Sequence, residues 1–490
     1  MAAVLSSGRS RADVREVVEP FLAPGSESDR APHVLQPTTV LMVEIPWGPG
    51  GFIPLSVPRS FLETCETEVC WPNLEGVLAD YGVRLDAALD DPVESPRIEE
   101  RVAPGSKVAL VVDDPSRWTP VGEVLPRVLQ RLHQAGIDRN DVTISVGVGR
   151  HQPVSPAAMA RRVGAEIAAV YRCLNPPVDE IRAYLELGTT ARGIPVRVFR
   201  PVAQADLRVM IGSVLPHLQA GFGGGYKLIL PGTSHRTTLG ALHRQGLEGG
   251  GDVSGLLGSD PKSNPMRLAV REAASLLGPC VSVSHLIGGP GEVLRVLAGE
   301  PEAVQDRLSQ EARRRFQAPA APPVDVLVVG NHPWPGDPMQ SFKVLLHHQS
   351  ACRAGGILVG YFWTDPAEIE RSFPARALRT IAATGTAGGW AIRQLVRHAE
   401  RAAFRRGSSW AFMVRWAREL VVDRDVLIYA PPLRERIGPR LGPIRIFSDQ
   451  EELWRAVVAA LGDRRVQPLR LRVFPQGGLT YVARSQVVGS

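Results

Sequence analysis

The feature that most limits the fold is an alternation between short β-branched runs and amphipathic stretches of helical spacing. In the first half of the chain, strands are predicted at residues 107–112, 142–148, 196–199 and 207–211. Helices are predicted at residues 121–135, 156–170 and 266–277. Strands that alternate with helices in this way form largely parallel sheets covered by those helices. The sequence therefore predicts an α/β fold.

The second half repeats the alternation after a break in composition. Residues 291–316 are charged and predicted to be mostly helical, with a break near Gly299 and Pro301. The Pro- and Ala-rich segment 317–323 is typical of a linker. Further strands are predicted at residues 324–329, 356–361, 426–429 and 445–447. We therefore expect two α/β domains with largely parallel sheets, at 37–316 and 323–490, after a loosely ordered extension at 1–36. A cleft between the two domains is the natural place for a ligand.

Composition narrows the class of protein. Of 490 residues, 44% are apolar and 22% charged, as in a globular chain with its own core. The formal charge of +6 includes no long Lys/Arg block, so neither nucleic acid nor a membrane is an expected partner. Five cysteines without C-x-x-C spacing argue against a thiolate zinc site or a disulfide framework. No apolar run reaches the ~18 residues of a membrane span and no signal-peptide core is present, so a cytoplasmic location is expected.

Lysine is rare in this chain. Only four of the 56 basic residues are lysine, namely Lys107, Lys227, Lys262 and Lys343. An amine can form a covalent bond to a ligand, whereas a guanidinium does not. Each lysine is therefore a candidate for chemistry.

The most unusual segment is a glycine-rich stretch at residues 215–232. Glycines at 221 and at 223–225 remove side chains and let the backbone approach something bulky. Lys227 follows at once, and His217 and His243 flank the stretch. The plainer interpretation is a flexible glycine turn with an incidental lysine.

Two phosphate-binding motifs do not fit this stretch. A P-loop needs Gly-Lys-Ser/Thr, whereas Lys227 lies between Tyr226 and Leu228. A dinucleotide fingerprint needs a helix-opening G-x-G-x-x-G, whereas this stretch ends in Pro231 and Gly232.

Polar residues also follow two of the predicted strands. Asp114, Ser116 and Arg117 lie where a strand ends and a helix begins, and Arg117 with the Ser116 hydroxyl suits a phosphate. An ordinary helix cap with a surface ion pair is the alternative. His151 lies beyond the next strand, where an imidazole that titrates near neutral pH can move protons.

In the second half, Gln340 and Lys343 are three residues apart. On a helix such residues share a face, and an amide beside an ammonium can bind a carboxylate.

Taken together, these elements resemble the nickel-dependent lactate racemase family. The resemblance extends from about Val43 to the last strands and leaves out the N-terminal extension. The most specific element runs from His217 through the glycines and Lys227 to Leu-Pro-Gly232. The Asp114-x-x-Arg117, Gly149-x-His151 and Gln340-x-x-Lys343 elements follow the family's order.

The resemblance implies a cofactor. Members of the family use a nickel-pincer nucleotide that is tethered to a lysine as a thioamide, and Lys227 stands at that position. His243 stands where a histidine completes the nickel coordination, and imidazole with soft sulfur is a reasonable donor set for nickel. Asp114 and Arg117 match residues that hold the phosphate end of the cofactor.

The resemblance also implies a reaction, the racemisation or epimerisation of a 2-hydroxy acid. His151 and His217 match the paired acid/base histidines, and Gln340 and Lys343 match the substrate-binding pair. One histidine takes the hydroxyl proton while a hydride moves from the α-carbon to the cofactor, and a planar 2-keto intermediate then receives the hydride on its other face. The first domain would carry the cofactor and the acid/base residues, and the second the substrate contacts. The implied partners are the small-molecule substrate and the enzymes that make the cofactor.

Three positions depart from the family pattern. Tyr226 replaces the usual arginine before the tethered lysine, and Gln152 replaces the arginine that follows the Gly-x-His element. Met339 replaces an aromatic residue before Gln340, which points to a substrate other than lactate. The proposed chemical groups are all present, so the reaction class is kept and the substrate stays open.

Two other functions compete with this one. A carrier of the nickel nucleotide needs only Lys227 and His243, so the presence of both His151 and His217 argues against it. A zinc hydrolase built on His217 and His243 lacks a clear third ligand.

Overall fold

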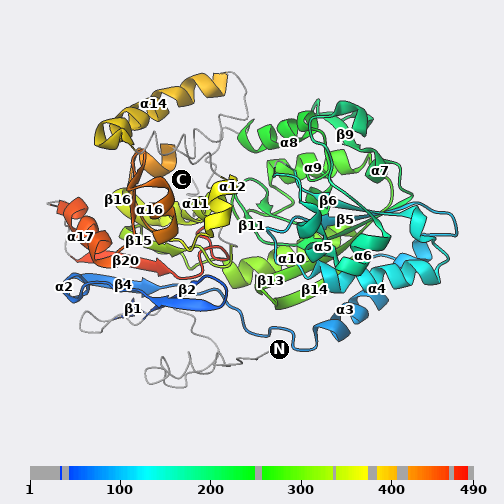
Figure 1. Ribbon diagram of the computed structural model, residues 1–490, viewed down its shortest axis with the longest axis horizontal. Helices are drawn as coiled ribbons and strands as arrows, with labels where there is room; N and C mark the ends of the chain where they lie inside the picture. Colours follow the sequence, from blue (N-terminus) through cyan, green and yellow to red (C-terminus); the bar gives the residue numbers. More distant parts are fainter. Residues whose placement is uncertain are drawn as a thin grey trace, which may run out of the picture. The chain divides into compact units, whose positions relative to one another are not determined.

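The protein is described from a computed structural model that covers residues 34–35, 43–149, 151–248, 256–334, 338–372, 383–405, 418–462 and 468–483. The predicted extension 1–36 lies outside the described residues, apart from 34–35. The structure is α/β, with two large sheets in which most neighbouring strands are parallel (Figure 1). This confirms the predicted fold class.

The first large sheet has six strands in the order β14-β13-β10-β5-β6-β7. Their bounds are β5 Val108–Asp113, β6 Val142–Gly147, β7 Arg172–Leu174, β10 Leu207–Ser213, β13 Cys280–Gly289 and β14 Glu292–Gly299. Only β13 and β14 pair antiparallel, and the other neighbours are parallel. Every residue of β5 and β10 is buried, as expected for parallel strands covered on both faces.

Helices lie on both faces of this sheet. They are α4 Val121–Gln134, α5 Pro156–Val163, α6 Ala165–Val170, α8 Arg236–Glu248, α9 Pro265–Ala274 and α10 Pro301–Phe316. The single helix predicted at 156–170 is two helices, because Gly164 adopts a φ of +97° and breaks it.

The prediction that residues 291–316 are mostly helical was wrong for the first part. Residues Glu292–Gly299 form β14, which pairs antiparallel with β13 and buries Val293, Leu294 and Val296. The helix α10 begins only at Pro301, where proline suits the first helical turn and the Glu300 side chain caps it. The partner strand β13 therefore decided the structure of a charged segment.

The second large sheet has eight strands in the order β1-β4-β20-β15-β16-β17-β19-β18. Their bounds are β1 Val34–Leu35, β4 Cys65–Val69, β15 Val324–Gly330, β16 Cys352–Tyr361, β17 Asp425–Tyr429, β18 Arg440–Leu441, β19 Ile444–Phe447 and β20 Leu469–Phe474. The strand β4 comes from the segment assigned to the first domain, yet it pairs in parallel with β20. The domain boundaries stay predictions, and this pairing shows that residues 65–69 belong to the second sheet.

The helices that follow the strands of the second sheet are α11 Pro338–His348, α12 Pro366–Ser372, α14 Gly385–Arg405, α16 Pro431–Ile437 and α17 Gln450–Leu461. The remaining helices and strands are β2 Glu44–Trp47, β3 Gly51–Pro54, α2 Arg59–Leu62, α3 Tyr81–Asp90, β8 Tyr184–Thr189, β9 Pro195–Phe199, α7 Arg200–Ala203, β11 Pro216–His217 and β12 Gly221–Phe222. One apolar cluster contains Leu215 and Phe222 together with Leu327 and Tyr481, so it joins residues that lie far apart in the chain. No helix of the described residues is long and apolar enough to cross a membrane.

Candidate active site

Three polar segments meet at the carboxyl ends of β5, β6 and β10. Because these strands are neighbours and parallel, the residues that follow them lie at one edge of the first sheet. Asp114 follows β5, His151 follows β6 and His217 follows β10. The topology thus brings together three residues that are far apart in the sequence.

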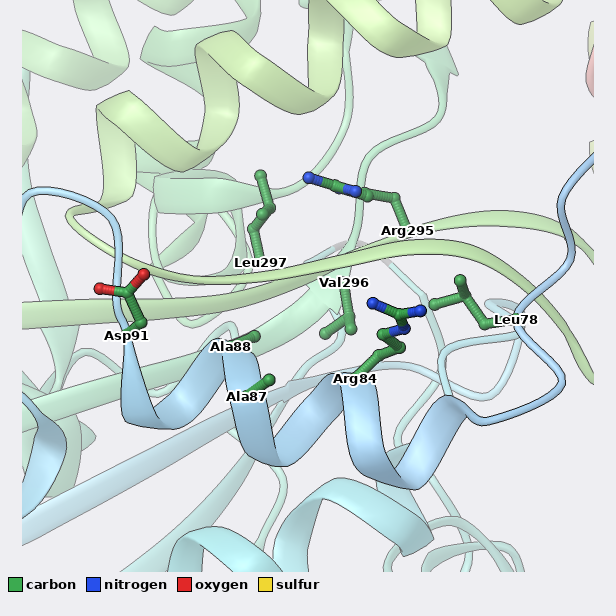
Figure 2. A pocket seen from close by; sticks show the side chains of 8 residues that line it. All are labelled: Leu78, Arg84, Ala87, Ala88, Asp91, Arg295, Val296 and Leu297. Carbon is green, nitrogen blue, oxygen red and sulfur yellow. The ribbon is translucent and has the colours of Figure 1, made fainter.

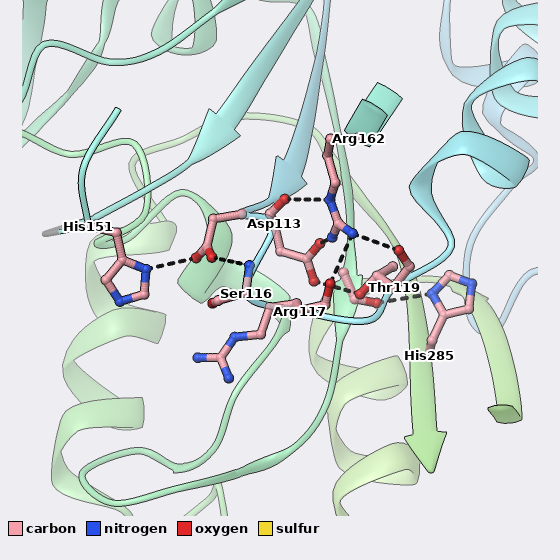
Figure 3. Close-up of polar contacts among 9 residues, drawn as sticks. Asp113, Ser116, Arg117, Thr119, His151, Arg162 and His285 are labelled. Carbon is pink, nitrogen blue, oxygen red and sulfur yellow. Dashed lines mark hydrogen bonds and ion pairs between the residues drawn. The ribbon is translucent and has the colours of Figure 1, made fainter. Parts of the chain in front are cut away.

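The loop after β5 is held by a buried ion pair. The carboxylate of Asp113 pairs with the Arg162 guanidinium and accepts a hydrogen bond from Thr119 Oγ1 at 2.6 Å (Figure 3). Arg162 Nη1 also donates to the carbonyl oxygens of Arg117 at 3.0 Å and Thr119 at 2.9 Å. A guanidinium fork that reaches several acceptors fixes the loop that carries Asp114 and Arg117.

Asp114 is buried and directed at His151. Its Oδ2 lies 3.1 Å from His151 Nδ1, and its Oδ1 accepts from the backbone N–H of Ser116 at 2.8 Å. Burial alone would raise the pKa of Asp114, but the His151 hydrogen bond and the charges of His151 and Arg117 hold that pKa below its usual range. The ionised carboxylate fixes the His151 tautomer with its proton on Nδ1, which leaves a lone pair on Nε2.

The helix α11 completes a chain of four polar side chains. Gln340 Nε2 donates to His151 Nε2 at 3.4 Å, and Lys343 Nζ donates to Gln340 Oε1 at 2.9 Å. The predicted acid/base residue and both predicted substrate residues are therefore contiguous, although 189 residues separate His151 from Gln340.

His217 is held differently. Its Nδ1 accepts backbone N–H groups from Gln219 at 3.2 Å and Ala220 at 3.1 Å, so the ring proton lies on Nε2. Burial lowers the pKa of His217 well below its ordinary value, and the positive charges of Lys227 and Arg117 lower it further. The two histidines therefore present opposite atoms, a lone pair on His151 and an N–H on His217.

Lys227 is half-buried and lies in a single 3-10 turn, Gly225–Leu228. The preceding Gly224 has a φ of +78°, which a residue with a Cβ rarely adopts. Burial lowers the pKa of Lys227 well below its ordinary value, and the nearby charges of Arg267, Arg117 and Lys343 add to this effect.

The predicted metal ligand His243 lies on α8. Its Nδ1 donates to Leu239 O at 2.7 Å, so a metal at His243 would have to bind through Nε2. Among the described residues, no group of three His, Cys, Asp or Glu side chains could hold a metal ion. A metal bound at His243 would therefore need donor atoms from a bound organic group, as a pincer ligand provides.

Other residues at the site suit an anionic nucleotide. The Ser116 and Ser213 hydroxyls are buried without a hydrogen-bond partner among the described residues, and each follows or ends a strand at the same sheet edge. The Arg117 guanidinium lies 4.9 Å from the centre of the Trp334 ring, in a cation–π contact. Unpaired hydroxyls beside an arginine fit a phosphate, so the residues present fit the implied cofactor.

Sequence reasoning missed two residues at this site. Trp334, in the loop after β15, stacks on Arg117, and its buried Nε1 has no partner among the described residues. His347 is 3% exposed, lies one helical turn beyond Lys343, and its Nδ1 likewise has no described partner. The only signal for His347 was its spacing of four from Lys343 and seven from Gln340, a helical face that has meaning only once the helix is placed.

The departures from the family pattern are partly visible. Tyr226 is half-buried and packs against the apolar cluster beneath Lys227, so it belongs to the core rather than to the charged site. Gln152 is exposed beside His151. The side chain of Met339 lies outside what the structure describes.

A separate hollow lies between α3 and β14. It has a volume of about 390 Å³ and is lined by Leu78, Arg84, Ala87, Ala88, Asp91, Arg295, Val296 and Leu297 (Figure 2). None of these is a predicted site residue, and Arg84 pairs with Asp80 at 3.0 Å. The hollow is therefore distinct from the cluster around His151.

Comparison with known proteins gives consistent results. Residues 63–252 match the model of the lactate racemase N-terminal domain. The chain is 24% identical over 282 residues to the lactate racemase of Thermoanaerobacterium thermosaccharolyticum, covering 56% of this chain and 63% of the relative. It is 26% identical over 159 residues to the lactate racemase of Lactiplantibacillus plantarum, covering 32% of this chain and 37% of the relative. The matched parts thus span less than two thirds of either relative.

Solved structures show the same fold. The lactate racemase apoprotein from Thermoanaerobacterium thermosaccharolyticum superposes with a TM-score of 0.67 and 17% identity, over 90% of this chain and 100% of the other. A protein from Thermotoga maritima gives a TM-score of 0.57 and 14% identity, over 82% and 97%. The domain match, the two relatives and the shared fold agree with the ordered motifs, and together they support a relationship of this chain to the lactate racemase family.

Proposed function

We propose that this protein is a racemase or epimerase of a 2-hydroxy acid. The observation that carries the proposal is the hydrogen-bonded chain Asp114–His151–Gln340–Lys343, which joins an acid/base pair to a carboxylate-binding pair. The relatives named lactate racemase support the same reaction class. An isomerase of this kind needs a fixed carboxylate and a proton acceptor at the neighbouring hydroxyl, and these four side chains supply both.

The substrate carboxylate would bind Lys343 and Gln340. A lysine ammonium is a compact charge, and the Gln340 amide adds a second donor that fixes orientation. With the carboxylate held, the α-carbon and its hydroxyl would face His151, since Gln340 already lies 3.4 Å from His151 Nε2. Substrate would displace that contact.

His151 would act as the base. Asp114 keeps the His151 proton on Nδ1, so Nε2 can take the substrate hydroxyl proton, and the carboxylate stabilises the resulting imidazolium. Asp114 is thus a positioning residue in this proposal, and its predicted contact with a cofactor phosphate remains a separate prediction.

His217 would serve the other enantiomer. Its Nε2–H would donate to the substrate oxygen, because both backbone contacts occupy Nδ1. Taking up a second proton would require those two contacts to be given up. The two directions of the reaction therefore start from histidines in different protonation patterns.

The cofactor would be the nickel-pincer nucleotide, held by Lys227 as tether, by His243 as nickel ligand and by Arg117 with the Ser116 hydroxyl at its phosphate. When bound, the group would supply the hydride acceptor that the protein side chains lack. Domain closure would keep water from the site. The enzymes that make the cofactor would be partners of the protein.

The substrate is proposed to be a 2-hydroxy acid longer than lactate, or one derived from a sugar. Met339 stands where the family has an aromatic residue, and a flexible thioether in place of a flat ring would favour a differently shaped substrate. Screening 2-hydroxy acids of increasing length with the loaded enzyme would test this.

The deciding experiment is intact mass and nickel analysis of protein made together with the cofactor's biosynthetic enzymes, with Lys227→Ala as control. A nickel-bearing adduct that is missing from the control would support the cofactor. Absence of both adduct and nickel from the unaltered protein would overturn the racemase proposal.

A carrier protein is the second candidate, and the His151→Ala, His217→Ala double variant separates the two functions. For a racemase, nickel stays bound while interconversion of the enantiomers is lost. Full activity in both single variants would contradict the proposed roles of these histidines.

A further inference from the structure

Arg267 is an arginine of α9 whose guanidinium is turned onto the glycine-rich turn before Lys227. It is 3% exposed and donates to the carbonyl oxygens of Ala220 at 3.4 Å, Gly223 at 2.6 Å and Gly224 at 3.1 Å. A fourth bond, at 2.5 Å, goes to the carbonyl oxygen of Phe222. A single buried cation thus gathers the carbonyl groups of this turn.

Two further side chains hold the same turn. Asn264, which caps α9, donates to Gln219 O at 2.9 Å. Gln305 of α10 donates to Gly223 O at 3.1 Å, and its Oε1 lies 2.8 Å from where a Cβ at Gly225 would be. Because Gly225 also has a φ of +58°, the backbone just before Lys227 is fixed from two helices and closed to side chains.

The charged groups that face Lys227 are all cations. They are Arg267 from α9, Arg117 from the loop after β5 and Lys343 from α11. None of the described groups that shift its pKa is a carboxylate, and burial acts in the same direction. Like-charge neighbours favour the neutral amine.

Two exposed lysines, Lys107 and Lys262, show the opposite environment. Lys107 pairs with Asp141, and Lys262 pairs with Asp306 at 3.0 Å. Those carboxylates raise the pKa of each lysine above its ordinary value. Lys107 and Lys262 can therefore serve as internal references when the reactivity of Lys227 is measured.

We propose that Arg267 is a positioning residue that holds the glycine-rich turn and presents the Lys227 amine as a nucleophile toward an acyl or thioacyl donor. The inference rests on the proposed function for the identity of that donor, a cofactor carrying such a group. Arg267 thus prepares the lysine before any cofactor binds.

The chemistry can be followed with a simple donor, acetic anhydride. Lys227 Nζ attacks a carbonyl carbon, the new C–N bond forms, and the C–O bond to the leaving group breaks. Acetate leaves with the bonding electrons, and the proton lost from nitrogen passes to solvent. Only the uncharged amine has the required lone pair.

The test is trace acetylation of the cofactor-free protein between pH 6 and pH 10, with mass spectrometry of the lysine peptides. The rate for Lys227 is expected to level off at a lower pH than the rates for Lys107 and Lys262. The rates for Lys107 and Lys262 should keep rising about tenfold per pH unit through pH 10, because their carboxylate partners raise the pKa of each above that of an ordinary lysine. Parallel profiles for Lys227 and the two reference lysines would overturn the proposal without any variant.

Variants separate the role of Arg267 from folding. Arg267→Gln keeps amide donors but removes the charge, so the Lys227 profile should move to higher pH. Acetylation at pH 7 should then fall about tenfold for each pH unit by which the profile moves. Arg267→Lys keeps the charge without the fork, so the profile should stay at low pH while the maximal rate falls. Arg271→Gln is the matched control, since Arg271 lies on the same helix and pairs with Glu302 at 2.5 Å.

The outcomes are distinct. An Arg267→Gln protein that folds, by circular dichroism, with an unchanged Lys227 profile would overturn the proposal. If that variant fails to fold, an Arg267→Lys protein with the unaltered rate and profile would overturn it. A reactive Lys227 in protein that never acquires the nickel adduct would refute the proposed function and leave this inference standing.

Discussion

At the scale of single residues, the informative contact is between Asp114 and His151. They are 37 positions apart in the chain and meet at 3.1 Å because β5 and β6 are adjacent and parallel. A carboxylate on one imidazole nitrogen sets the tautomer and so decides which nitrogen can act as base. The activity of His151 should therefore depend on Asp114.

Asp114→Asn tests this dependence. The amide keeps the acceptor for the Ser116 N–H but loses the charge that stabilises the His151 imidazolium. We expect kcat to fall by about 10²-fold or more, with bound nickel unchanged, as measured by racemisation and metal analysis. Loss of nickel in parallel with activity would instead support the phosphate-binding role predicted for Asp114.

A second residue-scale prediction concerns Lys343. Lys343→Met removes the charge that would hold the substrate carboxylate, a contact worth about 1.5–3 kcal/mol. KM should rise at least about tenfold while the Lys227 adduct and nickel remain. The exposed Lys262→Met, away from this contact chain, is the matched control and should leave KM unchanged. An unaltered KM in Lys343→Met would remove Lys343 from the substrate site.

At the scale of elements, the turn before Lys227 is the most constrained part of the site. Its shape depends on glycines with positive φ and on the carbonyl groups that Arg267 gathers. These contacts fix the path of a segment whose glycine content alone also allowed a flexible turn.

Gly224→Ala is expected to disrupt this turn. A Cβ there would lie 2.8 Å from Ser213 O, in addition to the strain of a φ of +78°. We expect loss of the Lys227 adduct in intact-mass spectra and a free energy of unfolding lowered by more than the ~1–2 kcal/mol that left-handed strain alone costs. Gly291→Ala is the control, because its φ of +73° is similar but nothing lies within 4 Å of the new methyl group. Equal effects of the two substitutions would show that the close approach at Ser213 is unimportant.

At the scale of the whole molecule, two buried histidines lie outside the reaction, one in β13 of the first sheet and one in α11, the helix that follows β15 of the second sheet. His285 of β13 donates from Nδ1 to Gly212 O at 3.0 Å, and its Nε2 lies 2.9 Å from the Tyr81 hydroxyl. His348 of α11 donates to Val344 O at 2.8 Å and contacts the Thr480 hydroxyl. Burial lowers the pKa of His285 to about 4 and that of His348 to about 3.

These shifts predict loss of stability in acid. Because both pKa values lie below the ordinary 6.5, the unfolded chain binds more protons, so stability is complete above about pH 6.5 and falls as pH drops toward 4 and then 3. His285 alone accounts for about 3 kcal/mol at the limit. Urea unfolding between pH 4 and pH 8 should show this slope, and a smaller slope in His285→Gln. A free energy of unfolding that does not change over this range would contradict the assignment.

Much of the fold could be predicted from the sequence because the relevant signals are local. The strands predicted near 107–112, 142–148, 324–329 and 426–429 were confirmed within a few residues, since β-branched runs are visible in the chain itself. The α/β class follows from their alternation with helices. The four ordered motifs likewise pointed to a resemblance to the lactate racemase family before any geometry was known.

The tertiary structure decided the features that depend on contacts between segments far apart in the chain. Residues 292–299 form a strand because β13 lies beside them. Similarly, β4 belongs to the second sheet because it pairs with β20. Asp114 contacts His151 because the ends of β5 and β6 lie side by side. Arg267 binds the carbonyl groups of the glycine turn because α9 packs beside that turn. A sequence pattern specifies an element through its neighbours along the chain, whereas a buried charge is satisfied by whichever distant group the packing brings to it.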